Sequence, residues 1–105
     1  PSRQEFEDFV KPIMEISWNP IRAIEWIPVV SREEREEMEI QAQIDMNISN
    51  LSFKQIDGSN TKNTYSPKMK IDIEREVYYP VYYVFPYDGN EYSLLLNLFL
   101  PPLSL

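Results

Sequence analysis

The apolar residues of the first sixteen positions recur every three or four residues, which places them on one face of a helix. They are Phe6, Phe9, Val10 and Ile13. Ser2, followed three residues later by Glu5, is typical of a capping box at the start of such a helix. Pro12 has no amide proton and its ring crowds the preceding turn. The pattern therefore predicts a kink or break at Pro12 and two short helical pieces.

A second helical pattern covers residues 32 to 43. Its least solvated stripe consists of Arg35, Met38 and Ala42. The other positions are almost wholly charged, which is typical of a solvated helix surface. Ser31 and Glu34 repeat the capping pattern at the start of this helix.

Segments rich in β-branched and aromatic residues predict the strands. These segments are 21 to 30, 47 to 56, 77 to 85 and 92 to 99. The pair Asp88-Gly89 indicates a hairpin turn over Tyr87 to Asn90, between the last two segments. Residues 57 to 70 collect glycine, asparagine, threonine, serine and proline with few apolar residues, and they are predicted to form an exposed loop.

This order of elements predicts helices packed on one face of an antiparallel sheet, an α+β fold. A chain of 105 residues is large enough for one domain with a single core. PAS-like sensor domains share this architecture, although many other small α+β domains have it as well, and a fold does not by itself imply a function.

Composition excludes several classes of function. A net charge of −7 repels phosphate backbones, so no nucleic-acid partner is expected. The chain has no histidine, which removes the commonest general base and the commonest metal ligand, and no cysteine, which removes thiolate sites, so we expect no enzyme, metal or cofactor. The acidic pairs Asp72 with Glu74 and Glu7 with Asp8 are interpreted as surface carboxylates. The apolar run from Leu94 to Leu105 contains two prolines and is shorter than the ~20 residues of a membrane-spanning helix.

Three blocks of the sequence resemble one sensory family, the CHASE domain. The blocks are SRQEFEDFV from Ser2, IRAIEWIPVVSREEREEME from Ile21, and REVYYPVYYVFPYDGNEYSLLLNL from Arg75. They follow each other in the family's order over nearly the whole chain. Two places depart from the family. Many relatives carry glycine, an aromatic residue and aspartate where this chain has Leu95, Leu96 and Asn97, and the tail from Leu100 no longer follows the family.

The resemblance implies an extracellular input domain of a histidine kinase, a nucleotide cyclase or a plant cytokinin receptor. Complete family domains have about twice this length, so residues 1–105 resemble the membrane-distal, PAS-like half. That half binds small ligands in the family. We therefore expect a small-molecule ligand, a homodimeric parent receptor, membrane attachment only through segments outside these residues, and a periplasmic location.

The resemblance also implies a ligand contact at Glu76, which matches the position of an acidic adenine-binding residue in the plant proteins. If Glu76 faces a pocket, strand alternation predicts Tyr78, Pro80 and Tyr82 on the same face. Leu94 and Leu96 of the partner strand complete the predicted wall. Each of these residues is open to a second interpretation, because tyrosine and leucine in strands usually pack in the core and Glu76 fits an exposed carboxylate near Arg75.

Two other functions compete with ligand sensing. The domain could serve only as a spacer or dimerisation module of the receptor, and a filled core beneath Tyr78 and Tyr82 would favour that hypothesis. Catalysis has only the neighbouring carboxylates to support it.

Overall fold

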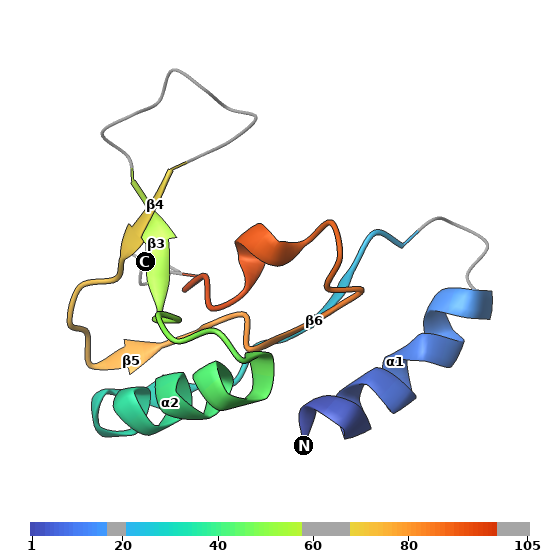
Figure 1. Ribbon diagram of the computed structural model, residues 1–105, viewed down its shortest axis with the longest axis horizontal. Helices are drawn as coiled ribbons and strands as arrows, with labels where there is room; N and C mark the ends of the chain where they lie inside the picture. The colour runs from blue at the N-terminus through green and yellow to red at the C-terminus, as the bar shows by residue number, and fades with distance from the viewer. Residues whose placement is uncertain (17–20, 58–67, 99–105) are drawn as a thin grey trace, which may run out of the picture.

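The computed structural model describes residues 1–16, 21–57 and 68–98 (Figure 1). The elements in chain order are α1 (Arg3–Ile16), β1 (Ile24–Trp26), β2 (Val30–Ser31), the 3₁₀ turn η1 (Arg32–Glu34), α2 (Arg35–Met46), β3 (Lys54–Ile56), β4 (Met69–Ile71), β5 (Val77–Tyr78), β6 (Tyr83–Phe85) and the 3₁₀ turn η2 (Glu91–Ser93). Helices and antiparallel strands are both present, which confirms the α+β class. Most of the predicted loop at 57 to 70 lies outside the described residues.

Helix α1 begins with the predicted capping box. The Glu5 amide donates to Ser2 Oγ at 3.1 Å, and the Ser2 amide donates to the Glu5 carboxylate at 3.2 Å. The prediction of two helical pieces separated by a break is wrong, because α1 continues through Pro12. Asp8, whose carbonyl loses its helical partner, lies with Pro12 on the exposed side, where water can bond to that carbonyl.

Helix α2 follows a 3₁₀ turn that carries the second predicted cap. The Ser31 amide donates to Glu34 Oε1 at 3.0 Å. The helix ends at Asn47, whose φ of 55° is the left-handed conformation of a helix C-terminus. The predicted stripe is confirmed, since Ala42 is fully buried and Arg35 is partly buried.

The strands are shorter than predicted. Segment 21 to 30 divides into β1 and β2, and segment 77 to 85 divides into β5 and β6, while β3 is the described strand of 47 to 56. Prolines lie at both divisions, Pro28 in the first segment and Pro80 in the second. Proline cannot donate to a strand ladder, so pairing stops there and resumes beyond it. Strand β1 pairs with β6, β2 with β5 and β3 with β4, all antiparallel.

The predicted turn at Asp88-Gly89 is present, but a hairpin strand does not follow it. The Asn90 amide donates to the Tyr87 carbonyl at 2.9 Å, and Gly89 has a φ of 88°. Turn η2 comes next, and then Leu95, which is fully buried with a φ of 63°. This positive φ is the backbone conformation that glycine adopts most readily.

Residues 95 to 98 join the ladders to one another. The amide of Leu95 donates to the Val81 carbonyl at 2.8 Å, and the Leu95 carbonyl accepts from the Lys54 amide at 3.1 Å. This segment therefore lies between the β5–β6 segment and β3. The described strands nonetheless form three two-stranded ladders, so the PAS-like arrangement is not confirmed.

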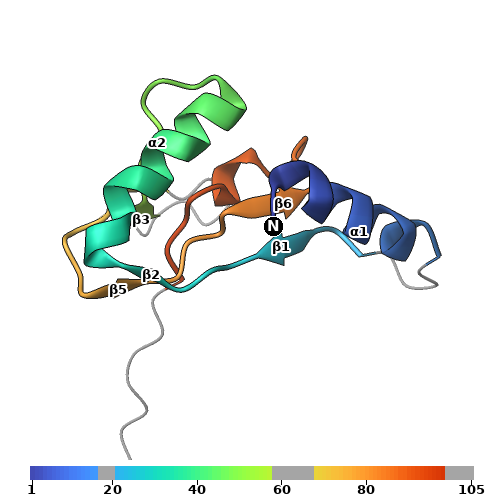
Figure 2. The ribbon, with the colours of Figure 1, turned by 90° about the horizontal axis from the view of Figure 1, so that it is seen from below.

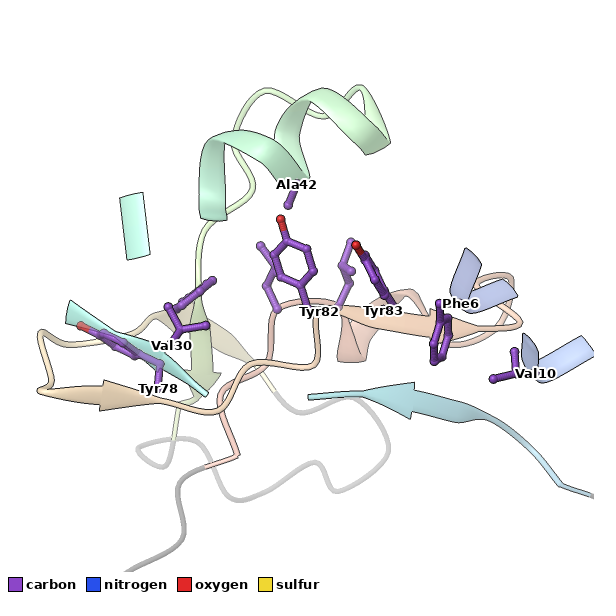
Figure 3. Packing of buried hydrophobic residues seen from close by; sticks show 10 residues of the cluster. Phe6, Val10, Val30, Ala42, Tyr78, Tyr82 and Tyr83 are labelled. Atoms are coloured by element: carbon purple, nitrogen blue, oxygen red, sulfur yellow. The ribbon is translucent and has the colours of Figure 1, made fainter. Parts of the chain in front are cut away.

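Helices α1 and α2 lie on the same side of the strands, as Figure 2 shows. Between helices and strands lies an aromatic core. Tyr82 and Tyr83 both point from the strand toward the helices (Figure 3). Tyr83 stacks on Trp26 with ring centroids 4.9 Å apart, and its ring lies 5.5 Å from that of Phe6 in α1. Tyr82 donates its hydroxyl proton to the Met38 carbonyl of α2 at 2.9 Å. These two tyrosines hold the helices to the sheet.

Tyr82 gives the domain a dependence on alkaline pH. Burial, with Tyr83 and Asp45 nearby, raises the pKa of the Tyr82 phenol to about 12. The folded state therefore keeps a proton that the unfolded chain releases near pH 10, and the stability that this provides is lost as pH rises from about 10 to 12. We expect Tyr82→Phe to cost about 1 kcal/mol at pH 8 through the lost hydrogen bond. Urea denaturation of the purified domain across this pH range should then show that the free energy of unfolding falls less steeply with pH in Tyr82→Phe than in the wild type.

The exposed Tyr92 provides the matched control, because 61% of this residue is accessible to solvent. Tyr92→Phe should follow the wild-type pH profile. If the free energy of unfolding falls equally steeply with pH above pH 10 in Tyr82→Phe and in the wild type, the pH dependence does not come from Tyr82.

Candidate functional site

A buried arginine joins α2 to three other segments of the chain. Arg35 donates from Nη1 to the Tyr78 hydroxyl at 3.0 Å and to the Ile73 carbonyl at 3.1 Å. Its Nη2 donates to the Asp72 carbonyl at 3.2 Å and to the Phe53 carbonyl at 3.4 Å. The guanidinium also lies over the rings of Tyr78, at 4.8 Å, and Phe53, at 5.4 Å. One side chain thus uses both its donors and its planar face.

Glu39 balances this charge from one turn further along α2. Its carboxylate accepts from Arg35 Nε at 3.2 Å and from the Phe53 amide at 2.7 Å, and it also accepts from the Ser52 hydroxyl. Burial disfavours a charged guanidinium, but the hydrogen bonds with Tyr78 and Glu39 outweigh burial and raise the pKa of Arg35 above its usual value. Arg35 is therefore charged at every pH at which the domain is folded.

A second buried charge extends the network toward the C-terminal segment. The Asp72 carboxylate, whose side chain is fully buried, pairs with Arg75 at 3.1 Å. It also accepts from Asn97 Nδ2 at 2.8 Å, and Asn97 Oδ1 in turn accepts from the Tyr79 amide at 2.6 Å. Asp72 was interpreted as a surface carboxylate paired with Glu74, and that interpretation is wrong. Of these two carboxylates only Glu74 is exposed, and it contacts Arg32 at 3.4 Å.

The structure places Glu76 outside the core. Its side chain is 81% exposed and pairs with Arg32 at 2.8 Å across the β2–β5 ladder. Tyr78, two residues later, is fully buried. Strand β5 contains only Val77 and Tyr78. Glu76 lies before this strand, so strand alternation does not place its side chain on the same face as that of Tyr78.

The other predicted site residues lie in or beside the core. Tyr78, Pro80, Tyr82 and Leu94 are buried, and Leu96 is partly buried. Tyr78 packs edge-on against Phe53 with ring centroids 5.4 Å apart, and Tyr82 packs edge-on against Trp26 at 6.2 Å. Their contacts are those of packing residues. A role for these five side chains in ligand binding remains a prediction.

Leu94 also borders a small cavity beside the β3–β4 ladder. The cavity has a volume of about 290 Å³, and its lining includes Leu51, Lys54, Lys70 and Leu94. Burial lowers the pKa of the Lys54 ammonium. One predicted site residue, Leu94, therefore lines a cavity that is also lined by two lysine side chains.

A larger cleft lies between the two helices. Its volume is about 470 Å³, within the range of small-molecule sites. The lining includes Arg3, Gln4 and Glu7 of α1, Gln41 and Asp45 of α2, and Tyr83 of β6. Sequence reasoning did not find this cleft, because nothing in the spacing of Arg3 and Asp45, over forty residues apart, shows that they face each other.

Neither a metal centre nor a membrane span is apparent in the part of the chain that the structure describes. Residues 1–16, 21–57 and 68–98 contain no group of three or more acidic, histidine or cysteine side chains placed to hold a metal ion. In the same ranges, no helix is long and apolar enough to cross a bilayer.

We expect Arg35→Met to destabilise the domain by about 3–5 kcal/mol, because it removes the cation that pairs with the partly buried Glu39 carboxylate together with the hydrogen bonds to the carbonyl groups of residues 53, 72 and 73. Arg32→Met is the matched control, since Arg32 lies three residues earlier and its ion pairs, worth up to about 1 kcal/mol each, and its hydrogen bond to the Arg75 carbonyl are all exposed. Urea denaturation followed by tryptophan fluorescence measures both losses. Similar losses for the two variants would show that the Arg35 network contributes no more than a surface pair.

Comparison with known proteins agrees with the resemblance in the sequence. The family model of the CHASE domain matches residues 1–100. No curated protein and no solved structure matches the chain. A family match over nearly the whole length decides the family, and this chain belongs to the CHASE domains, the extracellular sensory domains of signalling receptors.

Proposed function

We propose that this domain senses a small ligand on the periplasmic side of the inner membrane for a membrane-bound receptor. The receptor is a histidine kinase or a nucleotide cyclase, including those that make cyclic di-GMP, and it is a homodimer anchored by segments outside residues 1–105. The family match over residues 1–100 is the observation that carries the proposal. Residues 1–105 would form the membrane-distal half of the sensor.

The architecture supports a sensing function. The cleft of about 470 Å³ lies between α1 and α2, two helices on the same side of the strands. A ligand can shift a receptor between two conformations only if it binds one of them more tightly. A ligand between two separately packed helices meets this condition, because its contacts depend on how the helices lie relative to each other.

Ligand binding should appear as added stability of the full-length protein. A ligand at about 100 times its dissociation constant adds roughly 2.7 kcal/mol of stability to the state that binds it. We expect at least one member of a panel of adenine derivatives, carboxylic acids, amines and amino acids to raise the unfolding temperature and to change receptor output. A panel without any such compound would contradict the sensing proposal.

The same assay tests the site predicted from the resemblance. If Glu76 contacts the ligand, Glu76→Ala should abolish the thermal shift while changing the stability of the ligand-free protein by no more than about 1 kcal/mol, as expected for an exposed ion pair. Glu74→Ala is the control, because Glu74 also contacts Arg32 and is also exposed. A full shift in Glu76→Ala would remove Glu76 from the site.

The second candidate function is dimerisation without ligand binding. Two observations favour it, the packed surroundings of Tyr78 and Tyr82 and an exposed apolar stripe on α1. The stripe consists of Phe9, Ile13 and Ile16, of which Phe9 is 72% exposed. Their spacing of four and three residues places them on one side of the helix.

If this stripe is the dimer contact, Phe9→Asp should convert a dimeric full-length protein into a monomer, because a charge placed in an apolar interface is costly. Sedimentation velocity measures the change. Val29→Asp is the control, since Val29 is 68% exposed and lies outside α1. A dimer that survives Phe9→Asp would place the interface elsewhere.

A further inference from the structure

The cleft between α1 and α2 contains an arginine without hydrogen bonds on one edge. Nε and Nη2 of Arg3 are buried, and neither has a hydrogen-bond partner among the described residues. These two atoms form one side of the guanidinium fork, the side that matches the two oxygens of a carboxylate. Buried donors without acceptors are costly, and a charged donor more so. The edge is therefore suited to accept a planar anionic group.

Tyr83 holds this arginine in place. The Arg3 guanidinium lies over the Tyr83 ring, 4.8 Å from its centroid, and the Tyr83 hydroxyl donates to the Pro1 carbonyl at 2.7 Å. Stacking on an aromatic ring orients a guanidinium without using any of its N–H donors. The fork is thus fixed in orientation while one of its edges stays unpaired.

The opposite side of the cleft is acidic. Asp45 reaches it from α2, where Gln41 donates to the Asp45 carboxylate at 2.8 Å and orients it. Glu7 lines the cleft one turn after Arg3. Burial raises the pKa of the Tyr83 phenol, Arg3 opposes this rise and Asp45 adds to it, so both charges act on the same ring. A cation and two carboxylates therefore share one small space.

From this arrangement we propose that the cleft binds a small zwitterion, a molecule with a carboxylate and a protonated amine such as an α-amino acid. The Arg3 fork takes the carboxylate, and Asp45 with Glu7 takes the ammonium group. The cleft has one more negative than positive side chain, so an anionic ligand without a cationic group would meet net repulsion. This inference rests on the proposed sensing function and names the ligand class of a site that the family resemblance did not indicate.

The same contacts suggest how binding would reach the helix. Because Nε and Nη2 are buried, a ligand oxygen reaches them only after the surroundings of Arg3 rearrange, and Arg3 belongs to the first turn of α1. The ligand thus binds the moved state more tightly than the resting state, which is the requirement for a shift in population. A change in the position of α1 is then the signal that ligand binding produces.

The test measures binding to the full-length protein by calorimetry, with the twenty common α-amino acids tested singly. Each amino acid that binds is compared with its decarboxylated amine and with the carboxylic acid that lacks the amine. We expect at least one amino acid to bind and both analogues to bind at least tenfold more weakly. Arg3→Lys, which keeps the charge but loses the fork, and Asp45→Asn should each weaken binding at least tenfold.

Arg22→Gln and Asp88→Asn are the matched controls, because both residues are exposed and do not line the cleft. They should bind like the wild type, and circular dichroism should show all four variants folded. Unchanged binding in Arg3→Lys would overturn the site. If only compounds of another class bind, the sensing function stands and the zwitterion site is wrong. If no compound binds and receptor output never responds, both proposals fail.

Discussion

The buried guanidinium of Arg35 is the interaction on which the rest of the domain depends. It is stacked against Phe53 and Tyr78 and bonded to carbonyl groups of residues 53, 72 and 73. These segments are short or irregular, and their backbones offer few partners to one another. A single planar cation with five donors can satisfy several carbonyl groups at once, which an apolar side chain cannot do. The network therefore stabilises a region where regular sheet pairing is sparse.

The C-terminal segment is tied to this network by a pair of matched residues. Asn97 donates to the buried Asp72 carboxylate and accepts from the Tyr79 amide. A carboxylate at position 97 would face Asp72 at close range and could not donate to it, whereas the Asn97 amide donates to the Asp72 carboxylate.

The aromatic core and the cleft between α1 and α2 meet at two tyrosines. Tyr82 and Tyr83 are adjacent in the chain, yet they make different contacts. Tyr82 bonds to α2 and closes the core, whereas Tyr83 supports Arg3 at the edge of the cleft. Tyr83 also contacts Phe6 of α1, the helix that carries Arg3, so one ring connects the cleft with the core.

Local chemistry in the sequence determined the family, the α+β class, the two capping boxes and the turn at Asp88-Gly89, because each depends on residues within a few positions of one another. Helix continuity through Pro12 depended instead on solvent exposure, which sequence spacing does not show. Only the tertiary structure decided the strand pairings, the exposure of Glu76 and the burial of Asp72. It alone brought Arg3 close to Asp45, since contacts between distant segments depend on how the elements pack.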